Sequence, residues 1–293
     1  MFEIMNRLVK QICTVLLGLV SASIAVTNVV AVELDSPQTA LKIMRKIHCS
    51  QEDGKIETFW WNGRAYSRVP GEKDRLLFQV EGMNTRRCVS LDGEVGFKLV
   101  SREILLYKDP LTGQILRSWE NPWTGDTVKV IHVANDPVNG KFTETGRDGR
   151  PVSLPLTIQG DQWWMTQTIP LFYKNPLGGD YQRYVGGMYQ ATEMFNYFGD
   201  VVDLENDDID SIATRIGWVR MSDWLPWMEM RGRAGMIYFH TAGRKVNGYA
   251  EISEVMKAEI ARNYPEYMKP PPLDDDRPNV TSWIFFKRSL STE

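Results

Sequence analysis

The sequence predicts a mainly β protein, an antiparallel barrel that is closed or nearly closed, with a short N-terminal helix and one C-terminal helix. Aromatic and β-branched residues form a dense strand pattern from Ile56 to Phe142 that resumes at Trp163. Turn signals built from Gly, Pro, Asn and Asp interrupt this pattern at short intervals. The chain also contains 10 Trp, 11 Tyr and 11 Phe in 293 residues. So many large aromatic side chains require a core or a pocket that buries them.

The N-terminus is typical of an export signal. Arg7 and Lys10 precede a charge-free, apolar stretch that ends at Val32. We expect cleavage after Ala31, with Ala25 as the other candidate, and export to the bacterial periplasm. The alternative is an uncleaved segment that anchors the protein to the inner membrane, since about 20 apolar residues can span a bilayer.

The expected domain organisation is a signal peptide over residues 1–31 and a single β-barrel domain over residues 32–293, because all-β domains often reach about 200 to 250 residues. A formal charge of −3, with both signs interspersed, leaves no basic surface for nucleic acid. Three scattered His and the absence of nucleotide, zinc or hydrolase motifs predict neither a metal nor a cofactor. The oligomeric state stays open.

The cysteines allow two interpretations. Cys13 lies inside the predicted signal, which leaves Cys49 and Cys88 in the mature chain. They form either one disulfide, as an oxidising compartment permits, or two buried thiols. Neither belongs to a C-x-x-C motif.

The first half of the chain predicts a helix followed by hairpins. Ser36 and Pro37 provide the cap and first position of a short helix that carries Leu41, Met44 and Ile47 on one side. Turn signals then predict an antiparallel meander. These signals are Asn62-Gly63, Pro70-Gly71, Asp92-Gly93, Asp109-Pro110 with Gly113, Pro122 with Gly125, Asn139-Gly140 and Asp148-Gly149.

A second strand-rich part follows. Its predicted strands cover Trp163–Tyr173, Tyr189–Phe198, Thr214–Met221 and Met236–Ala242. The acidic segment Asp203–Asp210 has Asp208 and Thr214 where an EF-hand requires Gly and Glu, so we expect a solvated loop.

The C-terminal part predicts one helix and one strand. Ser253 caps a helix that ends at Tyr264-Pro265, and the prolines 270–272 then force an extended connection. Ser282–Ser289 is predicted as the last strand. A distant strand that returns to a meander favours a barrel, because closure removes the sheet edges.

Several motifs resemble a bacterial exported family that is catalogued only as a domain of unknown function. They are Glu81-Gly82-Met83-Asn84, Asn121-Pro122 with Thr124-Gly125, Tyr189-Gln190-Ala191-Thr192-Glu193, Trp224-Leu225-Pro226-Trp227-Met228 and the tail from Pro270 to Trp283. The resemblance covers nearly all of the mature chain. It implies a lipocalin-like, calycin-type barrel and brings no known activity or catalytic residues.

Strand alternation points to polar residues within apolar rows. After Gly93, Glu103 lies in a row with Leu99, Leu105 and Tyr107. A buried carboxylate must be paired, hydrogen-bonded or protonated. Glu103 is therefore a candidate acid or base, and its alternative role is an ion pair with one of three nearby arginines. These are Arg86, Arg87 and Arg102.

Two histidines and a glutamine occur in similar rows. His132 alternates with Val128, Val130 and Ala134; Gln167 with Trp163, Met165, Ile169 and Leu171; and His240 with Met236, Tyr238 and Ala242. If these rows point inward, they place the polar side chains on an apolar cavity wall. The catalytic candidates are Glu103, His132 and His240. The alternative for each histidine is a hydrogen-bonded core position.

The candidate ligand-binding residues are mostly aromatic, since aromatic and Met side chains pack adaptably around apolar ligands. They are Tyr107, Trp119, Trp163, Gln167, Tyr189, Glu193, Trp224, Trp227 and Met228.

These residues support three hypotheses for function. The first is an exported β-barrel that binds an apolar or aromatic small molecule in a Trp-lined cavity. The second is a cofactor-independent isomerase, cyclase or lyase that acts on such a molecule by Glu/His acid–base chemistry. The third is an envelope interaction protein with a filled barrel. Under all three hypotheses we expect no nucleic acid as partner and no membrane span in the mature chain if the signal is cleaved.

Overall fold

A computed structural model describes residues 30–32, 36–177 and 187–291. The predicted export signal lies outside these residues except for its last two positions. The strands are β1 (Val30–Val32), β2 (Glu57–Arg68), β3 (Leu76–Ser90), β4 (Gly96–Lys108), β5 (Ser118–Glu120), β6 (Thr127–Lys129), β7 (Val133–Asn135), β8 (Gly140–Thr143), β9 (Leu156–Gln159), β10 (Gln162–Lys174), β11 (Met188–Asp200), β12 (Arg215–Ser222) and β13 (Met236–Val246). The helices are α2 (Pro37–His48), α3 (Val201–Glu205), α4 (Glu254–Asn263) and α5 (Ser282–Leu290), with short 3₁₀ turns η2 (Pro226–Met228), η3 (Tyr249–Glu251) and η4 (Pro265–Met268).

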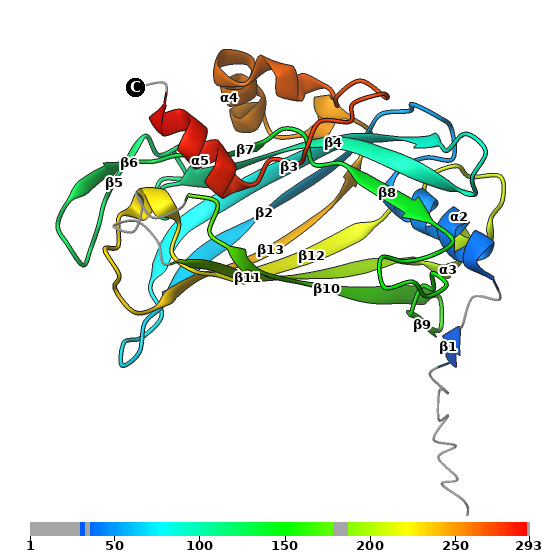
Figure 1. Cartoon of the computed structure of the whole chain (residues 1–293), viewed down its shortest axis with the longest axis horizontal. Coiled ribbons are helices and arrows are strands. Elements are labelled where there is room, and N and C mark those ends of the chain that lie inside the picture. The colour runs from blue at the N-terminus through cyan, green and yellow to red at the C-terminus, as the bar shows by residue number, and fades with distance from the viewer. Residues whose placement is uncertain (1–29, 33–35, 178–186, 292–293) are drawn as a thin grey trace, which may run out of the picture.

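The main sheet is antiparallel and strongly coiled (Figure 1). Its strands follow the order β1-β9-β10-β11-β12-β13-β2-β3-β4-β7, and β8 pairs with β4 as well. The mainly β, antiparallel class predicted from the sequence is confirmed. The sheet is not closed, because within the described residues no hydrogen-bonded ladder joins β10 to β4. On its outer edge β4 pairs only with the short strands β7, over three residues, and β8, over four residues.

The long strands follow from the aromatic runs, but one turn signal lies inside a strand. β2 continues for 12 residues through Asn62-Gly63, and Gly63 pairs with Val80 of β3. A Cβ at Gly63 would lie 2.2 Å from the backbone oxygen of His240. The glycine therefore permits a close approach of β13, and the hairpin predicted at this position is wrong; the chain turns at Pro70-Gly71 instead.

Two tryptophans lie flat over glycines on the neighbouring strand. Trp61 faces Gly82 across β2 and β3, and Trp163 faces Gly199 across β10 and β11. A Cβ at Gly82 would lie 2.3 Å from the Trp61 ring, and one at Gly199 would lie 2.6 Å from the Trp163 ring. This cross-strand pairing of an aromatic ring with glycine fixes the register and the ring orientation.

We expect Gly82→Ala to destabilise the protein by about 1–3 kcal/mol, because the new methyl group must displace the Trp61 ring from a packed wall. Gly217→Ala on β12 is the matched control, since the nearest atom to its Cβ would lie 3.8 Å away. Chemical denaturation of both variants measures the difference. Equal stabilities would contradict the packing described for Trp61.

The two larger apolar clusters lie on opposite faces of the sheet. The larger lies on the concave face and contains most of the buried aromatic side chains. The second lies on the outer face of β3 and β4, where Met83, Ile104 and Leu106 pack against Met256 and Ile260 of α4. β3 and β4 are thus buried on both faces over much of their length.

The first helix forms as predicted. Ser36 Oγ accepts the backbone N–H of Thr39, which caps α2 at its N-terminus. At the other end, the Lys245 ammonium donates to the carbonyl oxygens of Lys46 and Cys49. Cys49 itself forms a disulfide with Cys88 of β3, which decides between the two interpretations of these cysteines.

The last predicted strand is a helix. Thr281 Oγ1 accepts the backbone N–H of Ile284, and Trp283 and Phe286, three residues apart, are buried on one side of α5. This spacing fits a helical turn and not the alternation of a strand. α5 packs beside β7 and its two aromatic rings join the concave core, so the strand expected to close a barrel is absent from this position.

The acidic segment 203–210 also differs from a simple loop, because its first residues belong to α3. The Lys46 ammonium donates to the carbonyl oxygens of Asp203 and Asn206 at the end of this helix. The segment therefore packs against α2. Across the part of the chain that the structure describes, no helix has both the length and the apolarity to cross a bilayer.

Candidate functional site

The concave face of the sheet encloses a cavity of about 1070 Å³. Its walls come from β2, β3 and β4 on one side and from β10, β11 and β12 on the other. α2, β8 and the segment 152–155 complete it. The volume lies just above the usual range for small-molecule sites, about 300–1000 Å³.

Aromatic side chains form much of the cavity wall. Trp61 and Trp218 contact each other edge to face, with ring centroids 6.3 Å apart. Phe195 and Tyr197 stack on β11, and Phe142 covers the cavity from β8. Rings on several strands offer flat apolar surfaces to a ligand.

Glu103 points into this cavity from β4, between Ser101 and Leu105 of the same inner row. Burial, and then the charge of Glu193, raise the pKa of Glu103 to about 7. Glu103 Oε1 accepts a long hydrogen bond of 3.4 Å from Asn135 Nδ2. Near neutral pH this carboxyl is therefore divided between its protonated and ionised forms.

The ion pair considered for Glu103 does not form with the three candidate arginines. Arg102 lies 3.0 Å from Asp136, and Arg87 donates to the carbonyl oxygen of Pro271. Arg86 acts on Glu103 only at longer range. Glu103 is thus a half-buried acid without a salt bridge among the described residues.

The opposite wall carries a second carboxylate. Glu193 of β11 lies 2.6 Å from the Arg220 guanidinium of β12, its register partner. Arg220 also donates to the hydroxyl of Tyr189. Burial opposes the charge of Arg220, but the neighbouring Tyr189 and Glu193 outweigh it and raise its pKa. The cavity therefore places an ion-paired carboxylate across from a protonatable one.

A third polar group lies at the end of the cavity next to α2. Arg86 of β3 donates from Nε to Asn84 Oδ1 over 2.7 Å, and its Nη1 lies 3.4 Å from His48 Nδ1. Its guanidinium lies over the Phe59 ring at 4.6 Å. Burial, and then Arg86 and Lys245, lower the pKa of His48 to about 3, so this imidazole is neutral. Because arginine only donates, His48 Nδ1 accepts and its proton lies on Nε2.

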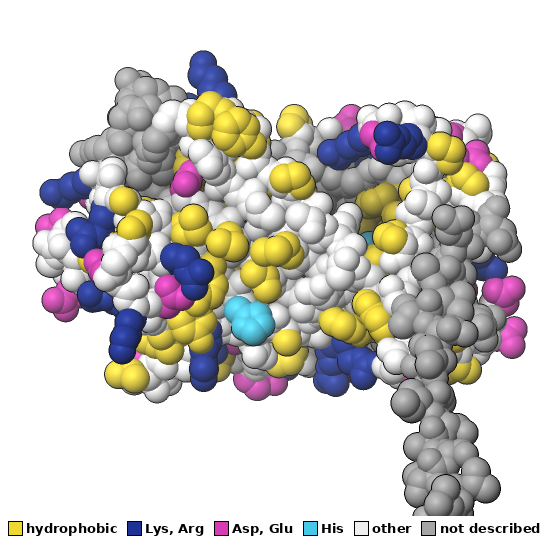
Figure 2. All heavy atoms as spheres, turned by 90° about the horizontal axis from the view of Figure 1, so that it is seen from below, with side chains coloured by type: hydrophobic (Ala, Val, Ile, Leu, Met, Phe, Trp, Pro, Cys, Tyr) yellow, Lys and Arg dark blue, Asp and Glu magenta, His cyan; other side chains and the backbone are white. Residues whose placement is uncertain are grey.

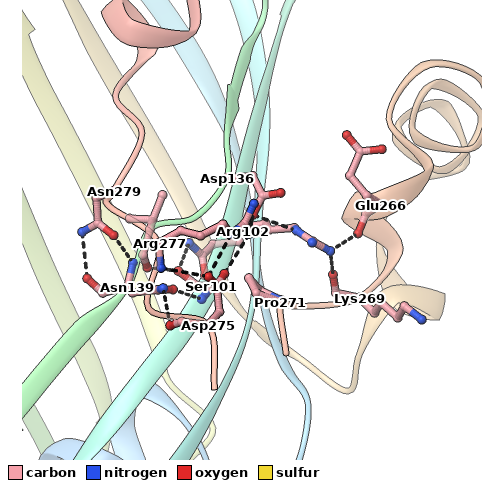
Figure 3. Close-up of polar contacts among 12 residues, drawn as sticks. Ser101, Arg102, Asp136, Asn139, Glu266, Lys269, Pro271, Asp275, Arg277 and Asn279 are labelled. Carbon is pink, nitrogen blue, oxygen red and sulfur yellow. Dashed lines mark hydrogen bonds and ion pairs between the residues drawn. The ribbon is translucent and has the colours of Figure 1, made fainter. Parts of the chain in front are cut away.

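The C-terminal tail holds the loop that borders the cavity (Figure 3). Asn139 accepts the backbone N–H of Ser101, and the side chain of Asn279 both accepts from Asn139 N and donates to Asn139 O. Arg277 bridges Asp136 and Asp275 at 2.8 and 2.7 Å. The tail thus fixes residues 138–140, which line the cavity.

Three of the residues predicted from the sequence line this cavity: Glu103, Gln167 and Glu193. Gln167 lies on β10 with Met165 and Ile169, as the alternation predicted, and it is exposed at the cavity edge. Tyr189 and Glu193, four residues apart, share the inner face of β11 because this segment is a strand.

His240 lies on the outer face of β13, where it is exposed. The inner row of this strand is Ile237, Phe239 and Thr241, which are buried. The row predicted to point inward therefore points outward, and the placement of His240 at a cavity wall is wrong. Figure 2 views the molecule from below, where hydrophobic side chains lie on the surface among basic and acidic ones.

His132 is buried but does not line the cavity. The chain does not form one strand across this region: β6 ends at Lys129 and β7 begins at Val133. His132 Nδ1 accepts the backbone N–H of Tyr107 over 3.1 Å, and burial lowers the pKa of His132 to about 4. His132 occupies the hydrogen-bonded core position that was its alternative.

The remaining candidates lie outside the cavity wall. They are Tyr107, Trp119, Trp163, Tyr189, Trp224, Trp227 and Met228. Trp119 is half-buried, and the other six are buried in the concave core, at the far end of the sheet or behind the cavity wall. Trp227 packs between Phe78 and Tyr107, with centroids 5.7 and 5.3 Å away, so its place is in a filled aromatic core.

Sequence reasoning missed Arg86, Asn84 and His48 as cavity residues. The signal was present for two of them, since Asn84 and Arg86 interrupt the apolar alternation of Phe78 and Val80 in β3. His48 gave no such signal, because only the docking of α2 brings it to Arg86. Within the described residues, no cluster of three His, Cys, Asp or Glu side chains could hold a metal ion.

Comparison with known proteins places the chain in a family without assigned chemistry. A family model described as "Protein of unknown function (DUF1838)" matches residues 54–290. No curated protein matches the chain.

Proposed function

The chain belongs to the DUF1838 family, and we propose that it binds an apolar or aromatic small molecule in the cavity between the two walls of the coiled sheet. The observation that carries this proposal is a cavity of about 1070 Å³ with aromatic walls and a few polar groups at fixed positions. Sites for small molecules have this composition. A filled barrel, the third hypothesis, would have no such space.

The shape of the sheet supports the same proposal. Successive antiparallel strands coil around the apolar space, as in lipocalin-type barrels that hold one ligand. We propose that this open sheet is a variant of that architecture. α5 and the concave aromatic core occupy the side on which a further strand would close it.

Export to the periplasm remains part of the proposal. Cys49 and Cys88 are bonded in the structure, and such bonds persist in oxidising compartments. Cleavage after Ala25 would keep β1 intact, whereas cleavage after Ala31 would remove two of its three residues.

We expect an aromatic ligand to quench or shift tryptophan fluorescence, because Trp61 and Trp218 line the cavity and would exchange solvent for a stacked ring. N-phenyl-1-naphthylamine, a neutral apolar fluorophore, is a suitable probe, and its emission should rise on binding. Native mass spectrometry of protein purified from its own host should reveal a retained small molecule. If the probe does not bind and neither Trp emission nor Tm changes over a screen of fatty acids, terpenoids and aromatics, the binding proposal fails.

A second candidate is a cofactor-independent isomerase, cyclase or lyase. Glu103 favours it, because an acid whose pKa lies near 7 can both donate and accept a proton at neutral pH. His132 and His240 do not line the cavity, so the partners of Glu103 would be Glu193 and Arg220 on the opposite wall. Turnover of the retained molecule by wild type, and its loss in Glu103→Gln, would separate this enzyme from a carrier.

A further inference from the structure

We propose that the ligand carries a carboxylate and that Arg86 binds it, with the apolar part of the ligand against the aromatic walls. This inference names the ligand class of the same cavity, so it depends on the proposed function. Its evidence is separate, because it comes from the hydrogen bonds and charges around one guanidinium.

Several N–H groups of Arg86 have no hydrogen-bond acceptor among the described residues. Of its five N–H groups, one bonds Asn84 Oδ1 and one points to His48 Nδ1. Within the described residues, Nη2 has no hydrogen-bond acceptor, and no carboxylate lies within the 4.0 Å of an ion pair. Arg86 is half-buried and lines the cavity, so its free N–H groups border the cavity.

A charge in such a place normally has a counterion, since an unpaired charge that is partly removed from water destabilises the fold. Burial lowers the pKa of Arg86, while Tyr197, Glu103 and Glu57 act in the opposite direction from longer range. Arg220, the other arginine of this interior, is paired with Glu193. The contrast indicates that the counterion of Arg86 comes with the ligand.

The surroundings hold the guanidinium ready for a planar anion. Phe59 lies under its face, and Asn84 fixes its Nε edge. The disulfide at Cys88, two residues further along β3, ties this part of the strand to α2. Because a preorganised guanidinium loses little freedom on binding, it suits a bidentate carboxylate.

The charge of the site favours one negative charge over two. His48 is neutral, and Asn84 and Ser101 carry no charge. Glu57, Glu103 and Glu193 lie in the same interior and would repel a phosphate dianion. Glu193 is already paired with Arg220, and the single charge that Arg86 carries without an ion pair matches a single carboxylate.

The body of the ligand would lie against Trp61 and Trp218, which line the same cavity as Arg86. Arg147 at its edge adds positive charge where an acid would approach. The resulting ligand is an aromatic or aliphatic acid, bound with its charged end toward α2.

The test compares naphthalene-2-carboxylate with naphthalene-2-carboxamide, which share their ring system and differ in charge. Each competes at neutral pH with N-phenyl-1-naphthylamine bound to the whole protein. Because charge-assisted hydrogen bonds in an enclosed site are strong, wild type should bind the carboxylate about 10- to 100-fold more tightly. Arg86→Gln should abolish this preference and keep the affinity for N-phenyl-1-naphthylamine, while Arg86→Lys should retain part of the preference.

Arg64→Gln is the matched control, since it removes the same charge from an exposed position on the outer face of β2. It should keep the preference of wild type, and circular dichroism melts should show that all variants fold. If wild type binds N-phenyl-1-naphthylamine but shows no preference for the acid, or if Arg86→Gln keeps the preference, this inference is overturned and the cavity function stands. If neither N-phenyl-1-naphthylamine nor any compound of the screen described above binds, the proposed function fails, and the inference fails with it.

Discussion

Glu103→Gln is expected to stabilise the protein relative to wild type at pH 8 and to leave its stability nearly unchanged at pH 4.5. In wild type the folded pKa of Glu103 is raised from 4.5 to about 7 by burial and by Glu193. A raised carboxyl pKa means that the folded state holds this proton more tightly than the unfolded chain. The corresponding stability is fully present below pH 4.5 and is lost as the pH rises through 7.

The size of the effect follows from the pKa shift. A change from 4.5 to about 7 corresponds to about 3 kcal/mol at 1.36 kcal/mol per pKa unit. Urea unfolding of both proteins over this pH range gives the difference. The difference in free energy of unfolding between wild type and Glu103→Gln cancels the titration of other groups. One of these is Lys245, whose pKa is lowered by burial to about 7.

The exposed Glu52 supplies the control, because Glu52→Gln makes the same chemical change at the surface of the protein. If Glu103→Gln unfolds the protein or loses stability at every pH, Glu103 is a structural group whose carboxyl the fold requires. If it gains stability and loses ligand binding or turnover, it behaves as a functional carboxyl. Full binding and full activity in the variant would exclude a functional role.

Removing the disulfide is expected to cost about 4 kcal/mol, the chain-entropy value for a loop of 39 residues. The double variant Cys49→Ala/Cys88→Ala is preferable to serine, because both positions are fully buried and a hydroxyl there would need a partner. Mass spectrometry of a non-reduced digest should first show the linked peptides in wild type. Thermal unfolding with and without reductant then measures the loss.

The double variant also provides its own control, since reductant should lower the Tm of wild type and leave that of the variant unchanged. We also expect the double variant to bind naphthalene-2-carboxylate slightly less tightly than wild type does, because α2 holds His48 against Arg86. If wild type and the double variant unfold at the same denaturant concentration, the bond does not contribute to the stability of this fold.

The sequence determined the local structure wherever one signal dominated. The alternation of β4 correctly placed Glu103 in one row with Leu99 and Leu105, because successive side chains of a strand point to opposite faces. The caps Ser36 and Ser253 correctly started α2 and α4, since each hydroxyl accepts the backbone N–H three residues later. Mainly antiparallel β structure followed from the same patterns.

Only the tertiary structure decided which face of each row is the inner one. Phe239 and His240 are successive residues of β13, so their side chains point to opposite faces of the sheet. Alternation alone does not say which of these faces is the inner one, and the coil of the sheet places His240 on the outer face. Gly63 resembled a hairpin residue, because the close approach of β13 that requires it comes from more than 170 residues away in the chain. Thr281 and Trp283 began a helix in a segment whose aromatic residues had suggested a strand.

The candidate site shows the same division. Composition and alternation determined that an aromatic interior with an acidic residue would exist, and Glu103, Gln167 and Glu193 do line the cavity. The pairing of Glu193 with Arg220 and the free donors of Arg86 depended on contacts between strands and with α2 that are distant in sequence. Local sequence sets which residues share a face, whereas the packing of distant elements sets which charges meet a partner and which remain available for a ligand.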